Sequence, residues 1–136
     1  MARRFDAHLR TGFLVAVCMA ASLLVAPASA QAQRAFPATA LRGAVVIGEA
    51  PEISLNGRPA RLSPGARIRD ASNLVVVPSG LIGSRFLVHY TLDTLGLVRE
   101  VWILTPQEAA KRPWPTTPAE AERLVFDPAA QSWSRP

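Results

Sequence analysis

An Asn-Gly pair between two short apolar runs constrains the fold of this chain more than any other local feature. Asn56-Gly57 lies between Ile53-Ser54-Leu55 and the segment 58–62. The pair supplies the two positive-φ residues of a type I′ turn, whose twist matches that of paired strands. The sequence therefore predicts a tight β-hairpin. Pro59 should lie on an outward edge of the second strand because proline cannot donate a ladder hydrogen bond.

Further β-type runs follow on both sides of this hairpin. Ser63-Pro64-Gly65 is predicted to be a turn, because proline and glycine favour a chain reversal. In the next short run Ile68 should point inward and Arg67 and Arg69 outward. The continuous apolar run 74–77 fits a strand covered on both faces. The predicted strands outside the hairpin are 41–48, 66–69, 74–77, 85–92 and 97–104.

The strand 85–92 alternates clearly between two faces. One face, predicted to enter the core, carries Phe86, Val88, Tyr90 and Leu92. His89 falls on the other face, where we expect an exposed strand histidine. Asp93–Gly96 is predicted to be the hairpin loop that leads into the returning strand.

The chain changes character after residue 104. Thr105-Pro106-Gln107-Glu108 has the pattern of a capping box with proline at the first helical position, and predicts a helix through Lys111. The same start signal recurs at Thr117–Glu120 and predicts a helix to about Leu124. Val125-Phe126 and Ser132-Trp133 flank a predicted turn that folds the tail back.

These elements predict a mainly β (α+β) fold with short C-terminal helices. Short strands at this spacing favour a small five- or six-stranded antiparallel barrel or a half-open sandwich, and an OB-like barrel is the first choice. We divide the chain into a flexible lead-in (31–40), a β domain (41–104) and a helical C-terminal appendix packed on that domain (105–136).

The first thirty residues have the three parts of a secretory signal. Arg3, Arg4 and Arg10 give a positive start, and the segment 12–26 carries no charge. That segment is shorter than the roughly 20 apolar residues of a stable membrane span. Ala28-Ser29-Ala30 predicts cleavage after Ala30, and a second A-x-A site places an alternative cleavage after Ala32. The predicted location is the periplasm, with secretion as the second choice.

Removal of residues 1–30 leaves one domain of 106 residues without cysteine or methionine. Val17 before Cys18 breaks the pattern of a lipoprotein signal, so we expect neither a lipid anchor nor a stable membrane segment after cleavage. Disulfides cannot stabilise the remaining chain, which has to rely on its hydrophobic core. The formal net charge falls from +5 to +3, a modest excess of basic residues.

Several stretches along the chain resemble a group of small, uncharacterised exported proteins of Gram-negative bacteria. The similarity spans roughly residues 35–136 and is more distant to exported OB-like domains. It implies the compartment and the fold, and no activity. The stretches are Leu41-Arg42-Gly43, Leu55-Asn56-Gly57, Leu62–Arg69, Val101–Pro106 and Trp114–Pro118.

Four arginines form the main candidate binding surface. Arg58, Arg61, Arg67 and Arg69 fall within twelve residues, and a guanidinium group suits phosphate or carboxylate. An anionic envelope component or another envelope protein is therefore a possible partner. The alternative is that these charges protect an edge hairpin from strand addition.

Trp114 and His89 are the remaining candidates. Trp114 between two prolines could dock on a partner, or could fold down to cover an open end of the barrel. His89 could act as a general base oriented by Asp93, with Ser79 or Ser84 as nucleophile. No motif fixes such a nucleophile, so a non-enzymatic accessory or binding protein is preferred over a small hydrolase. A structural subunit of an envelope complex is a third class, and would show an exposed apolar patch around Trp114.

Metal, cofactor and nucleic-acid binding are not predicted. A zinc site needs three or four converging ligands, and the chain after residue 30 has one histidine and no cysteine. Glu49 and Glu52 are interpreted as solvated hairpin ends. Export would separate the protein from nucleic acid, although OB-like barrels can bind it.

Overall fold

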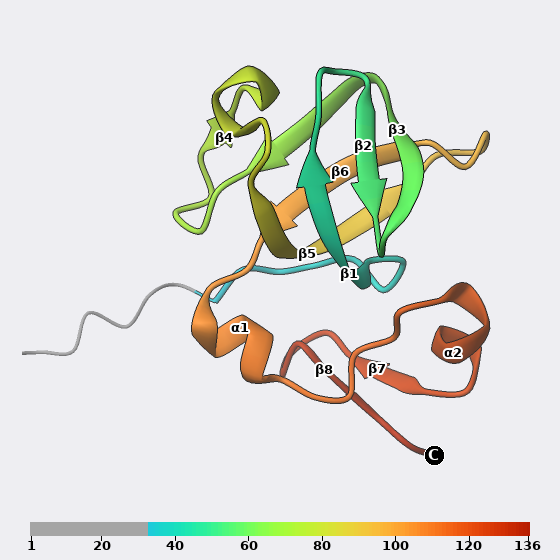
Figure 1. Cartoon of the computed structure of the whole chain (residues 1–136). Helices are drawn as coiled ribbons and strands as arrows, with labels where there is room; N and C mark the ends of the chain where they lie inside the picture. The colour runs from blue at the N-terminus through green and yellow to red at the C-terminus, as the bar shows by residue number, and fades with distance from the viewer. Residues whose placement is uncertain (1–32) are drawn as a thin grey trace, which may run out of the picture. The chain divides into compact units, whose positions relative to one another are not determined.

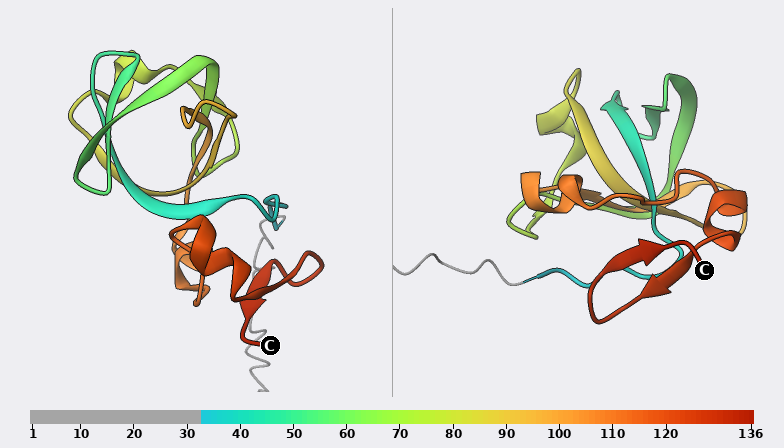
Figure 2. Two further views of the ribbon diagram at one scale, coloured as in Figure 1. Left: turned by 90° about the vertical axis from the view of Figure 1, so that its right-hand side faces the viewer. Right: turned by 90° about the horizontal axis from the view of Figure 1, so that it is seen from below.

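The computed structural model describes residues 33–136, which form a small, mainly β domain (Figure 1). The predicted signal segment, its cleavage sites and Cys18 lie outside the described residues. Strands β1 (Leu41–Ile47), β2 (Glu52–Leu55), β3 (Arg58–Arg69), β5 (Arg85–Leu92) and β6 (Val98–Ile103) form a closed barrel. Their order around it is β1-β2-β3-β6-β5, and the ring of strands is seen in Figure 2.

The Asn-Gly hairpin is confirmed. β2 and β3 pair antiparallel around Asn56 and Gly57, whose φ angles are 53° and 78°. The side-chain Oδ1 of Asn56 also accepts the N–H of Ala44 on β1 at 2.9 Å. The turn residue thus ties the hairpin to its neighbouring strand.

The expected turn at Ser63-Pro64-Gly65 is wrong. These residues lie within the continuous strand β3, which bends there because its pairing with β6 shifts register between Leu62 and Arg67. The first half of β3 pairs with β2, and its second half pairs with β6 and with β4 (Val75–Val76). A proline and a glycine inside a strand are tolerated at such an irregularity.

The pairing of β3 with β6 is parallel, so the barrel is mixed and not wholly antiparallel. The prediction of a double-covered strand at 74–77 is also wrong. β4 has two residues at the outside of the sheet, and Leu74, Val75 and Val77 are exposed. A 3₁₀ turn, η1 (Pro78–Leu81), then leads to β5.

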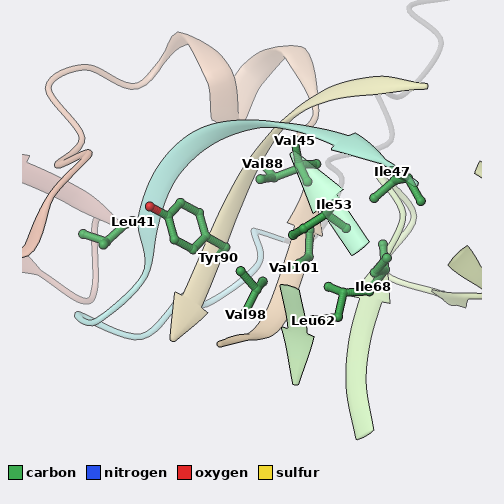
Figure 3. Close-up of a cluster of buried hydrophobic side chains, with 10 residues drawn as sticks. All are labelled: Leu41, Val45, Ile47, Ile53, Leu62, Ile68, Val88, Tyr90, Val98 and Val101. Carbon is green, nitrogen blue, oxygen red and sulfur yellow. The ribbon is translucent and has the colours of Figure 1, made fainter. Parts of the chain in front are cut away.

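The main core fills the barrel with aliphatic side chains and one tyrosine. Val88 and Tyr90 of β5 point into it, as the alternation predicts, but Leu92 at the end of the strand is exposed, beyond a register shift at Thr91/Leu92. Ile68 of β3 is buried between the outward Arg67 and Arg69. Figure 3 shows the cluster, which consists of Leu41, Val45, Ile47, Ile53, Leu62, Ile68, Val88, Tyr90, Val98 and Val101.

The C-terminal segment contains two short helices and a hairpin. Helix α1 (Pro106–Ala110) begins with the predicted capping box, in which Thr105 and Glu108 bond each other's backbone N–H. Helix α2 (Pro118–Glu122) has Thr117 as its N-cap. Strands β7 (Val125–Asp127) and β8 (Ser132–Ser134) form the returning tail. No helix within residues 33–136 is long and apolar enough to cross a membrane.

A second core joins this segment to the barrel. Phe36 and Ala40 from the lead-in and Trp114 and Trp133 from the C-terminal segment are all buried, and Trp102 of β6 packs against them. The described part of the lead-in is therefore packed in place, although it contains neither helix nor strand.

Candidate functional site

Arg67 and Arg69 lie together on the outer face of β3. Ile68 between them is buried in the barrel, so the two guanidinium groups leave the strand on the opposite side. Arg67 is exposed, and Arg69 is half-buried, with its Nη1 donating to the carbonyl of Asn73 at 3.4 Å. This part of the predicted basic surface is present as one pair of side chains.

Arg58 and Arg61 lie on the other half of the same strand. Arg61 is six residues from Arg67, which corresponds to about 20 Å along an extended chain. Its Nε lies 3.1 Å from Oε1 of Glu52, and both side chains are about 60% exposed. Arg61 therefore already has a carboxylate partner, whereas Arg67 and Arg69 form no ion pair within residues 33–136.

Trp114 is buried and not on the surface. It is 5% exposed, and its Nε1 donates to the carbonyl of Ala40 at 3.0 Å. Its ring packs against Phe36, Phe126 and Trp133. It covers the outer face of β5 at His89, whereas the covering role predicted from the sequence placed it over an open end. Its ring is therefore not available to a partner.

The expectation of an exposed His89 is wrong, because the residue is 1% exposed. Its ring stacks on Trp114, and its Nε2 lies 3.3 Å from Nε and 3.2 Å from Nη2 of Arg42. Burial, followed by the charges of Arg42 and Arg34, lowers the pKa of His89 to about 3. The imidazole is therefore neutral and accepts hydrogen from Arg42.

The residues proposed to assist His89 are engaged elsewhere. Oδ1 of Asp93 accepts the N–H groups of Leu95 and Leu97, both at 2.9 Å, and so closes the β5–β6 turn. Within residues 33–136, no serine or carboxylate is hydrogen-bonded to His89, and its Nδ1 has no partner. This environment does not prepare the imidazole for general-base chemistry.

Arg42 is a structural residue that the sequence did not single out. It lies opposite His89 in the β1–β5 register and is 8% exposed. Its guanidinium donates to the carbonyls of Glu108 (2.8 Å), Ala109 (3.2 Å) and Lys111 (2.7 Å). The last carbonyls of a helix lack intrahelical partners, so Arg42 fastens the end of α1 to the barrel.

Arg34 makes a second connection of this kind. It forms an ion pair with Glu108 and donates to the carbonyls of Asp70 (2.9 Å) and Ile103 (2.7 Å). Burial alone would raise the pKa of Glu108, but hydrogen bonds from Arg34 and Thr105 outweigh it and lower that pKa below its usual value. Both connections stabilise the fold and offer no free group for a ligand.

Other features are weaker candidates for a site. A shallow, open hollow lies over β1 and β2, lined by residues that include Val46, Gly48, Ser54 and Pro59, and the one charged lining residue is Glu52. Across the described range 33–136, no cluster of three or more histidine, cysteine or acidic residues could hold a metal ion.

No protein family, curated protein or solved structure matches this chain.

Proposed function

We propose that the protein is a non-enzymatic binding protein of the bacterial periplasm, and that Arg67 and Arg69 hold an anionic component of the cell envelope. One observation carries the proposal: two guanidinium groups leave the same outer face of β3, and neither forms an ion pair within residues 33–136. A guanidinium fork matches phosphate and carboxylate groups in geometry as well as in charge.

The amino-acid sequence of the first thirty residues supports the proposed compartment. A positive start, an uncharged apolar segment and Ala28-Ser29-Ala30 are typical of a cleaved export signal. The polyanions available to an exported protein in a Gram-negative envelope are lipopolysaccharide, anionic phospholipid and peptidoglycan. The remaining net charge of +3 favours contact with such surfaces.

We further propose that the barrel is OB-like. The strand order β1-β2-β3-β6-β5, with its five strands closed in a ring, supports this assignment. OB-like barrels bind ligands on a face that includes their second and third strands and on adjacent loops. In this chain the third strand, β3, carries Arg67 and Arg69.

A non-enzymatic role is favoured by the surroundings of His89. Its imidazole is buried against Trp114, and its partner is the cation of Arg42. A general base needs to reach the proton that it removes, and a ring with 1% exposure does not meet a substrate.

Retention of the exported protein on purified envelope components tests this function. We expect salt-sensitive retention on at least one of lipopolysaccharide, peptidoglycan sacculi and anionic phospholipid vesicles. Arg67→Ala with Arg69→Ala should abolish most of it. Arg58→Ala with Arg61→Ala should have a smaller effect, because Arg61 is already paired with Glu52.

Arg123→Ala with Arg135→Ala is the matched control, since it removes the same charge from exposed positions in the C-terminal segment. Equal losses in this control and in the Arg67/Arg69 variant would mean that only net charge matters. Undiminished retention of the Arg67/Arg69 variant on all three components would overturn the proposal.

A further inference from the structure

The segment between β3 and β5 exposes more apolar side chain than a solvated loop requires. Leu74, Val75, Val77 and Ile82 are 64%, 59%, 69% and 52% exposed. We call these four residues the apolar loop. Exposed apolar groups gathered in one segment mark an interaction surface more often than isolated ones do.

The apolar loop is bordered by basic side chains. Arg69 lies directly opposite Val75 in the β3–β4 register, and its Nη1 donates to the carbonyl of Asn73, which precedes Leu74. The exposed Arg85 begins β5 three residues after Ile82. The apolar loop is therefore flanked in the chain by basic residues, and one of them, Arg69, belongs to the proposed binding surface.

The loop itself contains no carboxylate, but Glu49 lies two residues after Ile47, whose backbone is hydrogen-bonded to Gly83 and Ser84. The sequence contains no aspartate or glutamate from residue 71 to residue 92. Asp70 precedes that stretch, but its Oδ1 accepts the N–H groups of Ser72 and Leu74, both at 2.9 Å. Glu100 on β6 lies opposite Arg67 in the strand register and is half-buried. Its negative charge reduces the positive potential at that position.

The loop lies at the side of the barrel that carries β4, away from β7 and β8 (Figures 1 and 2). The C-terminal segment covers the outer face of β5 at His89 and leaves the loop uncovered. Four apolar side chains in this segment bury far less area than the roughly 800 Å² per partner of a stable protein interface. They are better suited to a bilayer surface, into which a few side chains can insert.

We propose that this face binds the surface of an anionic phospholipid bilayer as a peripheral contact. Leu74, Val77 and Ile82 enter the headgroup region, while Arg67, Arg69 and Arg85 contact lipid phosphates. Buried apolar area and attraction to anionic lipid act together in interfacial binding. This inference rests on the proposed function and specifies its ligand.

Vesicle flotation with the exported protein tests the inference. The probes are phosphatidylglycerol-rich vesicles, phosphatidylcholine vesicles, lipopolysaccharide and peptidoglycan sacculi. We expect flotation with the phosphatidylglycerol-rich vesicles and little with phosphatidylcholine. Arg67→Ala with Arg69→Ala should weaken vesicle binding about thirtyfold at low salt. Leu74→Ser with Val77→Ser should weaken it about tenfold at any salt concentration.

Leu95→Ser is the matched control, because Leu95 is 82% exposed on the separate β5–β6 turn. It should leave vesicle binding unchanged. Circular dichroism of each variant verifies that the fold is retained, and the substituted side chains are all exposed or at the barrel surface.

The outcomes separate the inference from the proposed function. Arginine-dependent binding to lipopolysaccharide or sacculi, with no effect of Leu74→Ser and Val77→Ser, would overturn the inference and keep the proposed function. Loss of self-association in the Leu74/Val77 variant, without any vesicle binding by the unsubstituted protein, would instead assign the loop to a protein contact and also overturn the inference. Binding to none of the probes would overturn both.

Discussion

The imidazole of His89 and the indole of Trp114 stack with their centroids 4.0 Å apart and their planes 20° from parallel. His89 belongs to β5 of the barrel, and Trp114 belongs to the connection between α1 and α2. Phe36 from the lead-in meets the imidazole edge-on at 4.5 Å. Three separate parts of the chain thus meet at one buried ring, so the C-terminal segment is part of the folded domain.

Trp114→Ala should therefore destabilise the whole domain. Removing a buried tryptophan leaves a cavity and costs about 3–5 kcal/mol in the free energy of unfolding. Urea unfolding followed by far-UV circular dichroism measures this. Trp114→Phe keeps an aromatic ring but loses the hydrogen bond to Ala40, and should cost less. A loss below about 1 kcal/mol for Trp114→Ala would contradict the packing described here.

Arg42→Ala should lower the free energy of unfolding by about 3 kcal/mol, because it leaves the carbonyls of Ala109 and Lys111 without their side-chain donor and removes one of the two donors to the carbonyl of Glu108. Arg42→Lys should recover only part of the loss, since one ammonium group cannot reproduce a planar fork. Hydrogen exchange at the end of α1 should accelerate in both variants. Full recovery by lysine would show that charge alone matters at this position.

The stability of the domain should fall as the pH drops below 6.5. The pKa of His89 is about 3 in the folded protein, against 6.5 for an ordinary histidine. The unfolded chain therefore takes up a proton first, and the contribution of neutral His89 is complete above pH 6.5 and is lost as the pH falls toward 3. We expect a loss of about 2 kcal/mol between pH 7 and pH 5.

His89→Gln isolates this effect, because His89 is the only histidine after residue 30. Glutamine retains an acceptor for Arg42 and does not titrate. The pH dependence between 7 and 5 should flatten in the variant, whatever its absolute stability. Below pH 5 the protonation of Glu108, whose pKa is lowered in the folded protein, causes a second loss of stability. The variant and the unsubstituted protein should therefore be compared above pH 5. An unchanged slope would place the titrating group elsewhere.

Gly43 on β1 should not tolerate a side chain. A Cβ there would lie 2.9 Å from Oδ1 of Asn56 and 3.0 Å from a ring carbon of Tyr90. Gly43→Ala should cost about 1–3 kcal/mol in the free energy of unfolding. Gly80→Ala is the control, because a Cβ there meets nothing within 4 Å and the φ angle of Gly80 is not positive. Thermal unfolding of the two variants should separate them clearly.

The local signals in the sequence predicted the hairpins and helix starts well, because turn and cap chemistry is local. Asn56-Gly57 forms the expected hairpin, and the capping box at Thr105 begins α1. The pairing of β3 with β6 could not be predicted in this way, because it joins residues far apart in the chain. The bend at Pro64-Gly65 resembles a turn in sequence and only becomes a strand irregularity through that distant pairing.

The sequence also did not predict which single polar residues are buried. His89 alternates away from the core as predicted, yet the outer face of β5 is covered by Trp114, which is 25 residues later in the chain. Arg42 has no local signature, since its role depends on the register opposite His89. The outward pair Arg67 and Arg69 was predictable because strand alternation around Ile68 determines it.

The decisive measurement is the location of the protein after osmotic shock of cells, which releases the freely soluble contents of the periplasm. We expect the unsubstituted protein and the Arg123/Arg135 control to stay with the envelope, and the Arg67→Ala, Arg69→Ala variant to move to the released fraction. Release of the unsubstituted protein, or retention of the variant to the same extent, would contradict envelope binding through β3.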